Sequence, residues 1–294
     1  MIKKGVYAAT LSVLDENSSL NIEETITHAE NIISRGLHGV FFFGSTGQSQ
    51  FISMAEKKEL VSKLPLSKYK KNFFLGTGLN SIKDNIEFIK YSMEYDFNTF
   101  LVMPPAYGKG NSEEGVSKFY TQIIKNIPKV KIILYNFEKL SGFKFEPDFV
   151  KKLVSYFPKN IIGCKDSTSN LYEKTKIKDF LMFPGDESKL LKGLEVGCSG
   201  CISAVANVTH KLAREVFDDF QKNKPQKSNE KLINVRHAFD KFNLISGLHS
   251  YMSLQNSKFK NLLPPLTLLK PSDQKELLKK LEILKFNSNK NIAA

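Results

Sequence analysis

The sequence has 294 residues, of which 41% are hydrophobic, and a formal net charge of +13 at pH 7. A chain of this length can bury one large core, and α/β barrels routinely reach this size as a single domain. The only arginines are Arg35, Arg214 and Arg236, and the lysines are scattered with acids between them. This pattern favours solvated helix ends and faces over a nucleic-acid-binding surface, so no nucleic-acid partner is expected.

Targeting and redox signals are also weak. The N-terminus has no apolar region typical of a signal peptide, and no apolar run is long enough to cross a bilayer. We therefore expect a cytoplasmic protein without a membrane partner. The three cysteines do not form a disulfide framework. Cys198 and Cys201 have the spacing of a redox pair, but they lie inside an apolar stretch, which favours buried structural thiols.

Apolar runs alternate with helical patterns at intervals of roughly 25 to 30 residues. The expected strands are residues 6–11, 39–43, 73–76, 99–103, 131–135, 161–165, 180–183 and 200–203. The expected helices are 22–34, 53–63, 82–95, 113–126 and 148–156, and a helical pattern also follows each of the last three strands. Eight apolar strands alternating with helices predict a parallel sheet closed into a (β/α)8 barrel. No Gly-x-Gly-x-x-Gly motif follows the first strand, which disfavours dinucleotide binding.

A polar segment at residues 222–228 carries Pro225 and separates the barrel from further helical periodicity that continues to about Leu284. Pro264, Pro265 and Pro271 interrupt that periodicity. We therefore expect a barrel over residues 1–224 and a helical extension over 225–294, packed on the barrel or used in oligomerisation. The polar residues 287–291 are expected to fray.

Lys165 is the strongest candidate for catalysis. It follows the apolar run 161–164 and precedes a polar cluster at 166–170, which is where a buried strand should end. At the mouth of an apolar interior, desolvation disfavours the ammonium and favours the neutral amine that attacks carbonyls. A solvated lysine that merely closes a strand is the alternative, so the neighbouring strand ends decide between the two.

Chemistry in such a barrel lies at the carboxyl ends of the strands. After the second strand, Ser45, Thr46 and Gly47 form a turn whose hydroxyls and backbone N–H groups can hold a carboxylate or pass protons, although a hydroxyl-rich start of a helix is the alternative. The fifth strand ends at Tyr135, one barrel step from Lys165. Together these positions indicate a lysine-dependent enzyme.

The seventh strand ends at Gly185, followed by the acidic pair Asp186 and Glu187. These carboxylates could bind substrate hydroxyls. They could equally be the charged N-terminus of a helix.

These residues carry a resemblance to a known family. The chain is similar to the dihydrodipicolinate synthase and N-acetylneuraminate lyase family of class I aldolases over nearly its whole length. The motifs that carry the resemblance are 44–47, 76–78, the proline-rich segment 103–115, Tyr135-Asn136, 163–167, 185–186 and 201–203. Motifs in this order are highly specific for the family.

The resemblance implies a role for each matching residue. Lys165 would form an imine with pyruvate, Tyr135 would relay protons, and Ser45 with Thr46 would hold the carboxylate. Further substrate-binding candidates in or beside the motifs are Gly47, Tyr107, Ser167, Gly185, Asp186, Glu187 and Ser203. The resemblance also implies no metal or organic cofactor, and a homo-oligomer, either a tetramer or a dimer.

Departures from the family pattern bear on the substrate. The similar synthases carry an arginine shortly after the tyrosine-asparagine pair, and Leu140 stands there in this chain. Lys139 could supply a charge but not the bidentate fork of arginine. The triplet at 140–142 resembles the neuraminate lyases instead. Glu138, Gln48 and Gly108 also depart from the usual pattern, and the last of these leaves the role of the neighbouring Tyr107 open.

We therefore expect an aldolase that cleaves or makes a C–C bond to pyruvate, on a 2-keto-3-deoxy sugar acid or a substrate like N-acetylneuraminate. The alternative within the family is the synthase that condenses pyruvate with aspartate semialdehyde. Outside this class, the alternative is a catalytically silent basic binding module, and the presence of Lys165, Tyr135 and Thr46 argues against it.

Overall fold

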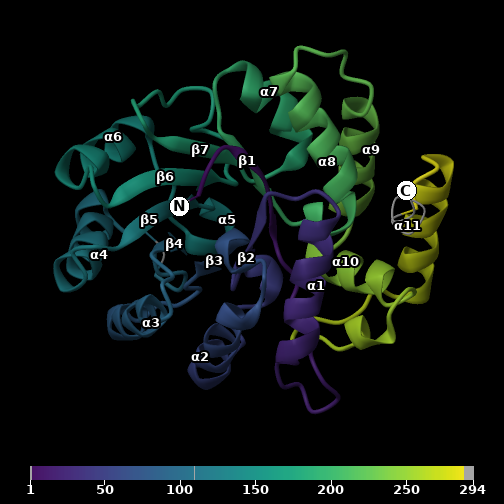
Figure 1. Cartoon of the computed structure of the whole chain (residues 1–294), viewed down its shortest axis with the longest axis horizontal. Coiled ribbons are helices and arrows are strands. Elements are labelled where there is room, and N and C mark those ends of the chain that lie inside the picture. The colour runs from purple at the N-terminus through teal and green to yellow at the C-terminus, as the bar shows by residue number, and fades with distance from the viewer. Residues whose placement is uncertain (1, 109, 288–294) are drawn as a thin grey trace.

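Eight parallel strands form one sheet that is nearly closed into a barrel (Figure 1). The strands are β1 (Gly5–Ala9), β2 (Gly39–Phe42), β3 (Phe73–Gly76), β4 (Thr99–Val102), β5 (Lys131–Asn136), β6 (Ile161–Asp166), β7 (Leu181–Pro184) and β8 (Gly200–Ser203). Their order is β7-β6-β5-β4-β3-β2-β1-β8. At the remaining junction, the Ser199 amide donates a 2.7 Å hydrogen bond to the Met182 carbonyl. The computed structural model describes residues 2–108 and 110–287, and it confirms the predicted barrel.

Helices surround the barrel, and all of them bury apolar side chains except the one-turn helix α5 (Glu138–Ser141), in which only Ser141 is buried. They are α1 (Ile22–Ser34), α2 (Met54–Lys63), α3 (Ile82–Glu94), α4 (Glu113–Asn126), α5 (Glu138–Ser141), α6 (Pro147–Tyr156), α7 (Leu190–Glu195) and α8 (Ala206–Gln221). Polar side chains start several of them: Asn21, Ser81 and Ser112 each accept a backbone N–H bond from the first turn. Ser53 forms a full capping box with Glu56.

The helix expected after the sixth strand is absent, and that prediction was wrong. Residues 167–180 form turns instead. The Asp166 carboxylate accepts hydrogen bonds from the backbone N–H groups of Ser169, Leu171 and Tyr172, at 2.8 to 3.0 Å. A side chain that binds nearby backbone groups in this way competes with helix formation.

The chain continues past the barrel into a helical extension, at the right of Figure 1. Its helices are α9 (Asn229–Asp240), α10 (Leu244–Met252) and α11 (Pro271–Ile283). Leu277 and Leu281 of α11 are buried, so this helix packs against the rest of the molecule. Of the segment 287–291 that we expected to fray, residues 288–291 lie outside the described residues. The division at residue 224 stays a prediction.

The apolar core has two parts. Inside the barrel lies a cluster that includes Tyr7, Phe41, Phe74 and Phe183, with Tyr135 near the carboxyl ends of the strands. A larger cluster fills the layer between the strands and the helices. All three cysteines are buried and unpaired, which confirms the prediction of structural thiols.

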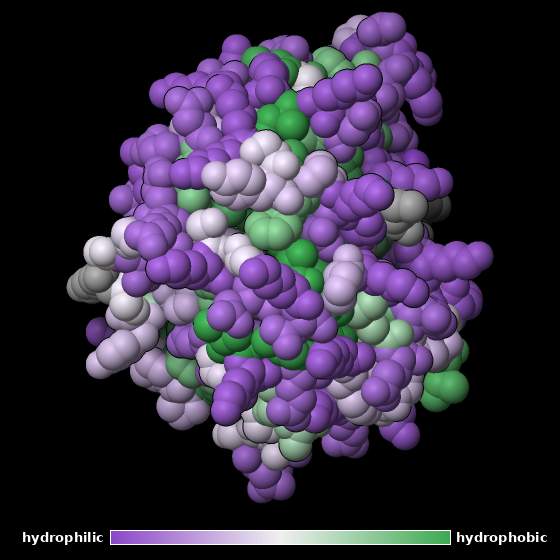
Figure 2. All heavy atoms as spheres, turned by 90° about the vertical axis from the view of Figure 1, so that its left-hand side faces the viewer, coloured by the Kyte–Doolittle hydropathy of each residue, from purple (hydrophilic) through white to green (hydrophobic). Residues whose placement is uncertain are grey.

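Hydrophilic side chains cover most of the face shown in Figure 2, with small apolar areas between them. This face is the left-hand side of Figure 1, where α3, α4 and α6 lie. None of the helices in the described ranges has both the length and the apolar composition that a membrane span requires.

Candidate active site

Lys165 and Tyr135 lie side by side at the carboxyl end of the barrel. Strands β5 and β6 pair in parallel, and their register places Tyr135 directly opposite Lys165. The Lys165 Nζ donates to the Tyr135 hydroxyl at 3.3 Å and lies 4.4 Å from the centroid of the tyrosine ring. Both side chains are buried, with exposed fractions of 3% for Lys165 and 4% for Tyr135. The amine is therefore held at the end of an apolar interior, as the sequence predicted.

The turn after β2 reaches the same tyrosine. Residues Ser45–Gly47 form a short 3-10 helix, η1, and the Ser45 hydroxyl lies 3.0 Å from the Tyr135 hydroxyl. Hydroxyl and amine groups thus form a continuous chain from Ser45 through Tyr135 to Lys165. Thr46 is buried beside Ser45. Such a chain can pass a proton between a reacting group and the turn.

Gly47 holds this turn against the segment that follows β1. A Cβ atom at Gly47 would lie 2.9 Å from the Thr10 carbonyl oxygen, which is closer than real Cβ atoms come. The Ser12 hydroxyl donates to the Gly47 carbonyl at 2.7 Å. Gly47 therefore positions the hydroxyls of η1 by letting two backbones approach closely.

The loops after β6 and β7 also touch each other. The Gly185 amide donates to the Asp166 carbonyl at 2.8 Å. A Cβ atom at Gly185 would lie 2.0 Å from the Ser167 hydroxyl oxygen, so only glycine fits there. The structure thus brings Ser167 and Gly185 together at the rim of the barrel. Ser167 lies two residues after Lys165, and Gly185 directly precedes Asp186.

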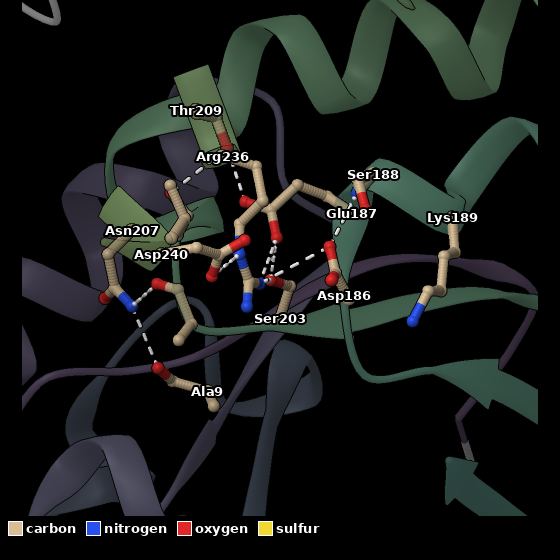
Figure 3. Close-up of polar contacts among 12 residues, drawn as sticks. Ala9, Asp186, Glu187, Ser188, Lys189, Ser203, Asn207, Thr209, Arg236 and Asp240 are labelled. Carbon is tan, nitrogen blue, oxygen red and sulfur yellow. Dashed lines mark hydrogen bonds and ion pairs between the residues drawn. The ribbon is translucent and has the colours of Figure 1, made fainter. Parts of the chain in front are cut away.

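The acidic pair after β7 is divided between two environments (Figure 3). Glu187 is fully buried, and its carboxylate binds the Arg236 guanidinium at 3.0 Å and the hydroxyls of Ser203 and Thr209. Burial raises the pKa of Glu187, and Arg236 opposes that shift. Glu187 and Ser203 are therefore already bound to each other and to Arg236. That Glu187 and Ser203 contact the substrate stays a prediction.

Asp186 keeps one free oxygen. Its Oδ1 accepts from the Ser188 amide at 2.8 Å and lies 3.5 Å from the Arg236 guanidinium. In the described residues, its Oδ2 accepts no hydrogen bond. Asp186 is the N-cap of a short 3-10 helix, η4 (Glu187–Lys189), so the pair also forms the charged helix start that was the alternative interpretation.

Tyr107 lies away from this cluster. It is 95% exposed on the loop between β4 and α4, and no contact joins it to the other candidates within the described chain. Its predicted contact with the substrate stays a prediction.

Sequence reasoning missed Arg236 and the role of Asp166. Arg236 lies on α9, far along the chain from β7, and no motif marks it. Asp166 immediately follows Lys165, and its carboxylate binds the Asn136 amide at 2.8 Å as well as the loop N–H groups. The only signal of that bond in the sequence was that an amide residue and an acidic residue end two successive strands.

No group of three or more His, Cys, Asp or Glu side chains in the described ranges is arranged to hold a metal ion. That the reaction needs no metal or cofactor stays a prediction.

A sequence model of the dihydrodipicolinate synthetase family matches residues 3–284. The chain belongs to this family. It is 31% identical over 221 residues to a 4-hydroxy-tetrahydrodipicolinate synthase of Bartonella bacilliformis, covering 73% of this chain and 74% of the relative. It is 30% identical over 202 residues to the synthase of Methanoculleus marisnigri, covering 66% and 67%. The family is one of pyruvate-dependent class I aldolases, which are lyases that use a lysine Schiff base.

Solved structures agree on the fold. Dihydrodipicolinate synthase of Agrobacterium tumefaciens superposes with a TM-score of 0.87 at 23% identity, covering 96% of this chain and 99% of that chain. A sialic acid aldolase of Ruminococcus gnavus, solved as a catalytic lysine mutant, superposes with a TM-score of 0.86 at 16% identity, covering 99% and 98%. Identities this low support the barrel architecture and leave the substrate open.

Proposed function

We propose that this protein is a pyruvate-dependent aldolase in which Lys165 forms the Schiff base with the 2-keto acid. The observation that carries the proposal is the buried contact between the Lys165 amine and the Tyr135 hydroxyl, continued to Ser45. A desolvated lysine next to a positioned phenol is the minimum that imine chemistry requires.

Each group has a step in this reaction. The Lys165 amine attacks the ketone of a 2-keto acid, and water leaves as the imine forms. The imine at C2 accepts the electrons of the C3–C4 bond, so this bond breaks to an aldehyde and an enamine of pyruvate. Tyr135 takes the proton from the hydroxyl that becomes the aldehyde and passes protons along the chain to Ser45. Ser45 and Thr46 hold the pyruvyl carboxylate.

The substrate we favour is a 2-keto-3-deoxy sugar acid or a substrate like N-acetylneuraminate. Leu140 and Lys139 are exposed after β5, so no guanidinium is available there for a second carboxylate. Arg236, the arginine at the β7 end, is already bound by Glu187 and Asp240. The free Oδ2 of Asp186 suits a substrate hydroxyl and repels a carboxylate.

The alternative substrate pair is pyruvate with aspartate semialdehyde. It is favoured by the names of the curated relatives, which are 4-hydroxy-tetrahydrodipicolinate synthases at 26% to 31% identity. Coupled assays on both substrate classes separate the two. A higher kcat/KM for the condensation than for the cleavage of any keto-deoxy sugar acid would replace our substrate and leave the Schiff-base chemistry intact.

Borohydride reduction in the presence of pyruvate tests the mechanism directly. We expect mass spectrometry to find one stable adduct on the peptide that carries Lys165. Lys57 offers a matched control because it is also a buried lysine, with its Nζ bound to the Thr77 carbonyl at 2.9 Å. An adduct that survives in Lys165→Ala, or one on Lys57, would refute the assignment.

A cytoplasmic location, a homo-oligomeric state and the absence of nucleic-acid and membrane partners also stay predictions. Sedimentation of the purified protein would test the oligomeric state.

A further inference from the structure

A small polar cavity lies outside the barrel, between α1, α8 and the segment that follows α10. Its volume is about 200 Å³, and its walls include His28, Asn31 and Arg35 of α1, His210 of α8 and Gln255. One water occupies about 30 Å³ of liquid, so the space suits several waters or one small metabolite. None of the residues assigned to the reaction lines this cavity.

His210 has polar atoms without a partner. Its side chain is 99% buried, since only 1% of its surface is exposed, and neither ring nitrogen makes a hydrogen bond within the described chain. Burial lowers the pKa of His210 to about 4, so the ring is neutral, with one N–H donor and one lone pair. The backbone carbonyl of Asn207 opposes that shift in pKa, but it does not reach hydrogen-bond geometry with the ring. A buried ring without partners costs free energy that a bound polar ligand would recover.

Arg35 brings an uncompensated positive charge to the same cavity. The other two arginines are paired, Arg214 with Asp218 and Arg236 with Glu187. In the described residues, the Arg35 guanidinium makes no ion pair and no hydrogen bond. Glu24, which also lines the cavity, is paired with Lys258 and does not neutralise Arg35. Arg35 acts on both cavity histidines, because its charge helps lower the pKa of His28 and of His210.

His28 connects the cavity to the rim of the barrel. The Asn207 amide nitrogen donates to the carbonyls of Ala9 and Ala204, as Figure 3 shows for Ala9. Its oxygen therefore faces the His28 Nε2 at 2.8 Å, so that nitrogen must carry the proton. Ala9 is the last residue of β1, and a ligand that contacts His28 is thus two hydrogen bonds from the strand ends.

We propose that this cavity binds a small oxyanion, either a carboxylate or a phosphate, through the Arg35 guanidinium and the His210 N–H group. The planar fork of arginine matches both anions, and a neutral imidazole adds a donor without needing a second charge. This site is separate from the Schiff-base site and does not depend on the proposed reaction.

Calorimetric titration with sodium phosphate and with sodium malonate, at constant ionic strength, tests the proposal. We expect saturable binding of one equivalent of at least one of these anions, and the two arms show whether phosphate or carboxylate is preferred. Arg35→Leu should weaken the binding by about tenfold or more. His210→Phe should weaken the binding as well. If His210→Phe does not fold, Arg35→Leu still tests the site, because Arg35 is partly exposed and its replacement should leave the fold intact.

Two controls define the site. Lys222→Leu removes one exposed positive charge just after α8 and should leave the affinity unchanged. Lys165→Met removes the amine of the proposed Schiff base and should also leave the anion affinity unchanged. The anion site can therefore be tested even if the proposed reaction is wrong. No saturable binding of either anion, or equal weakening by Arg35→Leu and Lys222→Leu, or loss of binding in Lys165→Met, would overturn the proposal.

Discussion

Tyr135 is the residue on which the geometry of the site converges. Its hydroxyl meets the Lys165 amine on one side and the Ser45 hydroxyl on the other, at 3.3 and 3.0 Å. Phe137 supports its ring, with centroids 5.9 Å apart. The phenol is therefore fixed by packing as well as by hydrogen bonds, which keeps its hydroxyl group between the Lys165 amine and the Ser45 hydroxyl.

Removing the Tyr135 hydroxyl should slow the reaction without unfolding the protein. We expect Tyr135→Phe to lower kcat by roughly 10² or more, because positioned acid–base groups contribute about 10² to 10⁴ in rate. Tyr7 provides a matched control: it lies in the same barrel cluster, but its hydroxyl donates to the Lys3 carbonyl at the opposite end. Steady-state kinetics of both variants check the prediction, and equal turnover in Tyr135→Phe and Tyr7→Phe would remove Tyr135 from the proton relay.

At the scale of elements, the helical extension is tied to the barrel at two places. Arg236 of α9 binds Glu187 behind the end of β7 and also pairs with Asp240 at 2.8 Å. Near η1, the Gln48 side chain accepts from the Leu263 amide at 2.8 Å, and its amide nitrogen lies 3.5 Å from the His249 ring. The extension thus fixes loops that border the candidate active site.

Cutting the first of these connections should destabilise the fold. Arg236→Leu leaves Glu187 buried without its partner, and we expect the free energy of unfolding to fall by about 3 to 5 kcal/mol. Arg214→Leu serves as the control, because its pair with Asp218 is partly exposed and should cost about 1 kcal/mol or less. Urea unfolding measures both losses.

The double variant Arg236→Leu with Glu187→Leu separates the cost of a bare charge from the value of the ion pair. Replacing both partners by apolar residues should recover much of the lost stability. A double variant that is less stable than Arg236→Leu alone would contradict this explanation.

For the whole molecule, three buried histidines make stability depend on pH. Burial is the largest cause that lowers the pKa of His28, His210 and His249 to about 4, from an ordinary value of 6.5. In the folded protein these rings stay neutral between pH 6.5 and 4, whereas in the unfolded chain they take up protons. Stability is therefore fully present above pH 6.5 and is lost as the pH falls towards 4.

We expect the urea midpoint to be constant above pH 6.5 and to drop as the pH falls from 6.5 to 4. For one histidine, a shift from 6.5 to about 4 corresponds to about 3 kcal/mol, since one pKa unit is ~1.4 kcal/mol. His249→Gln should flatten the pH dependence, because the variant no longer has the titrating ring that donates to the Phe259 carbonyl. A midpoint that is constant over this range, or a slope unchanged in His249→Gln, would show that the buried rings do not control acid stability.

The sequence was sufficient for the barrel and for the central contact of the site. Apolar runs at regular spacing require a parallel sheet, and in such a sheet Tyr135 and Lys165, which end neighbouring strands, must meet. It was misleading for residues 167–180, because the helical pattern there competes with the Asp166 carboxylate, and a side chain that binds three backbone N–H groups outweighs a weak propensity.

The partners of the charged side chains depended on tertiary structure alone. Local sequence shows that Asp186 and Glu187 start a helix at a strand end, but not that Arg236 of α9 takes one of them into the interior. Likewise, His28, Arg35 and His210 have no common motif, and their cavity exists only because α1 and α8 are packed together. Periodicity determines which residues are buried along one element, whereas the pairing of charges depends on distances between elements that are far apart in the chain.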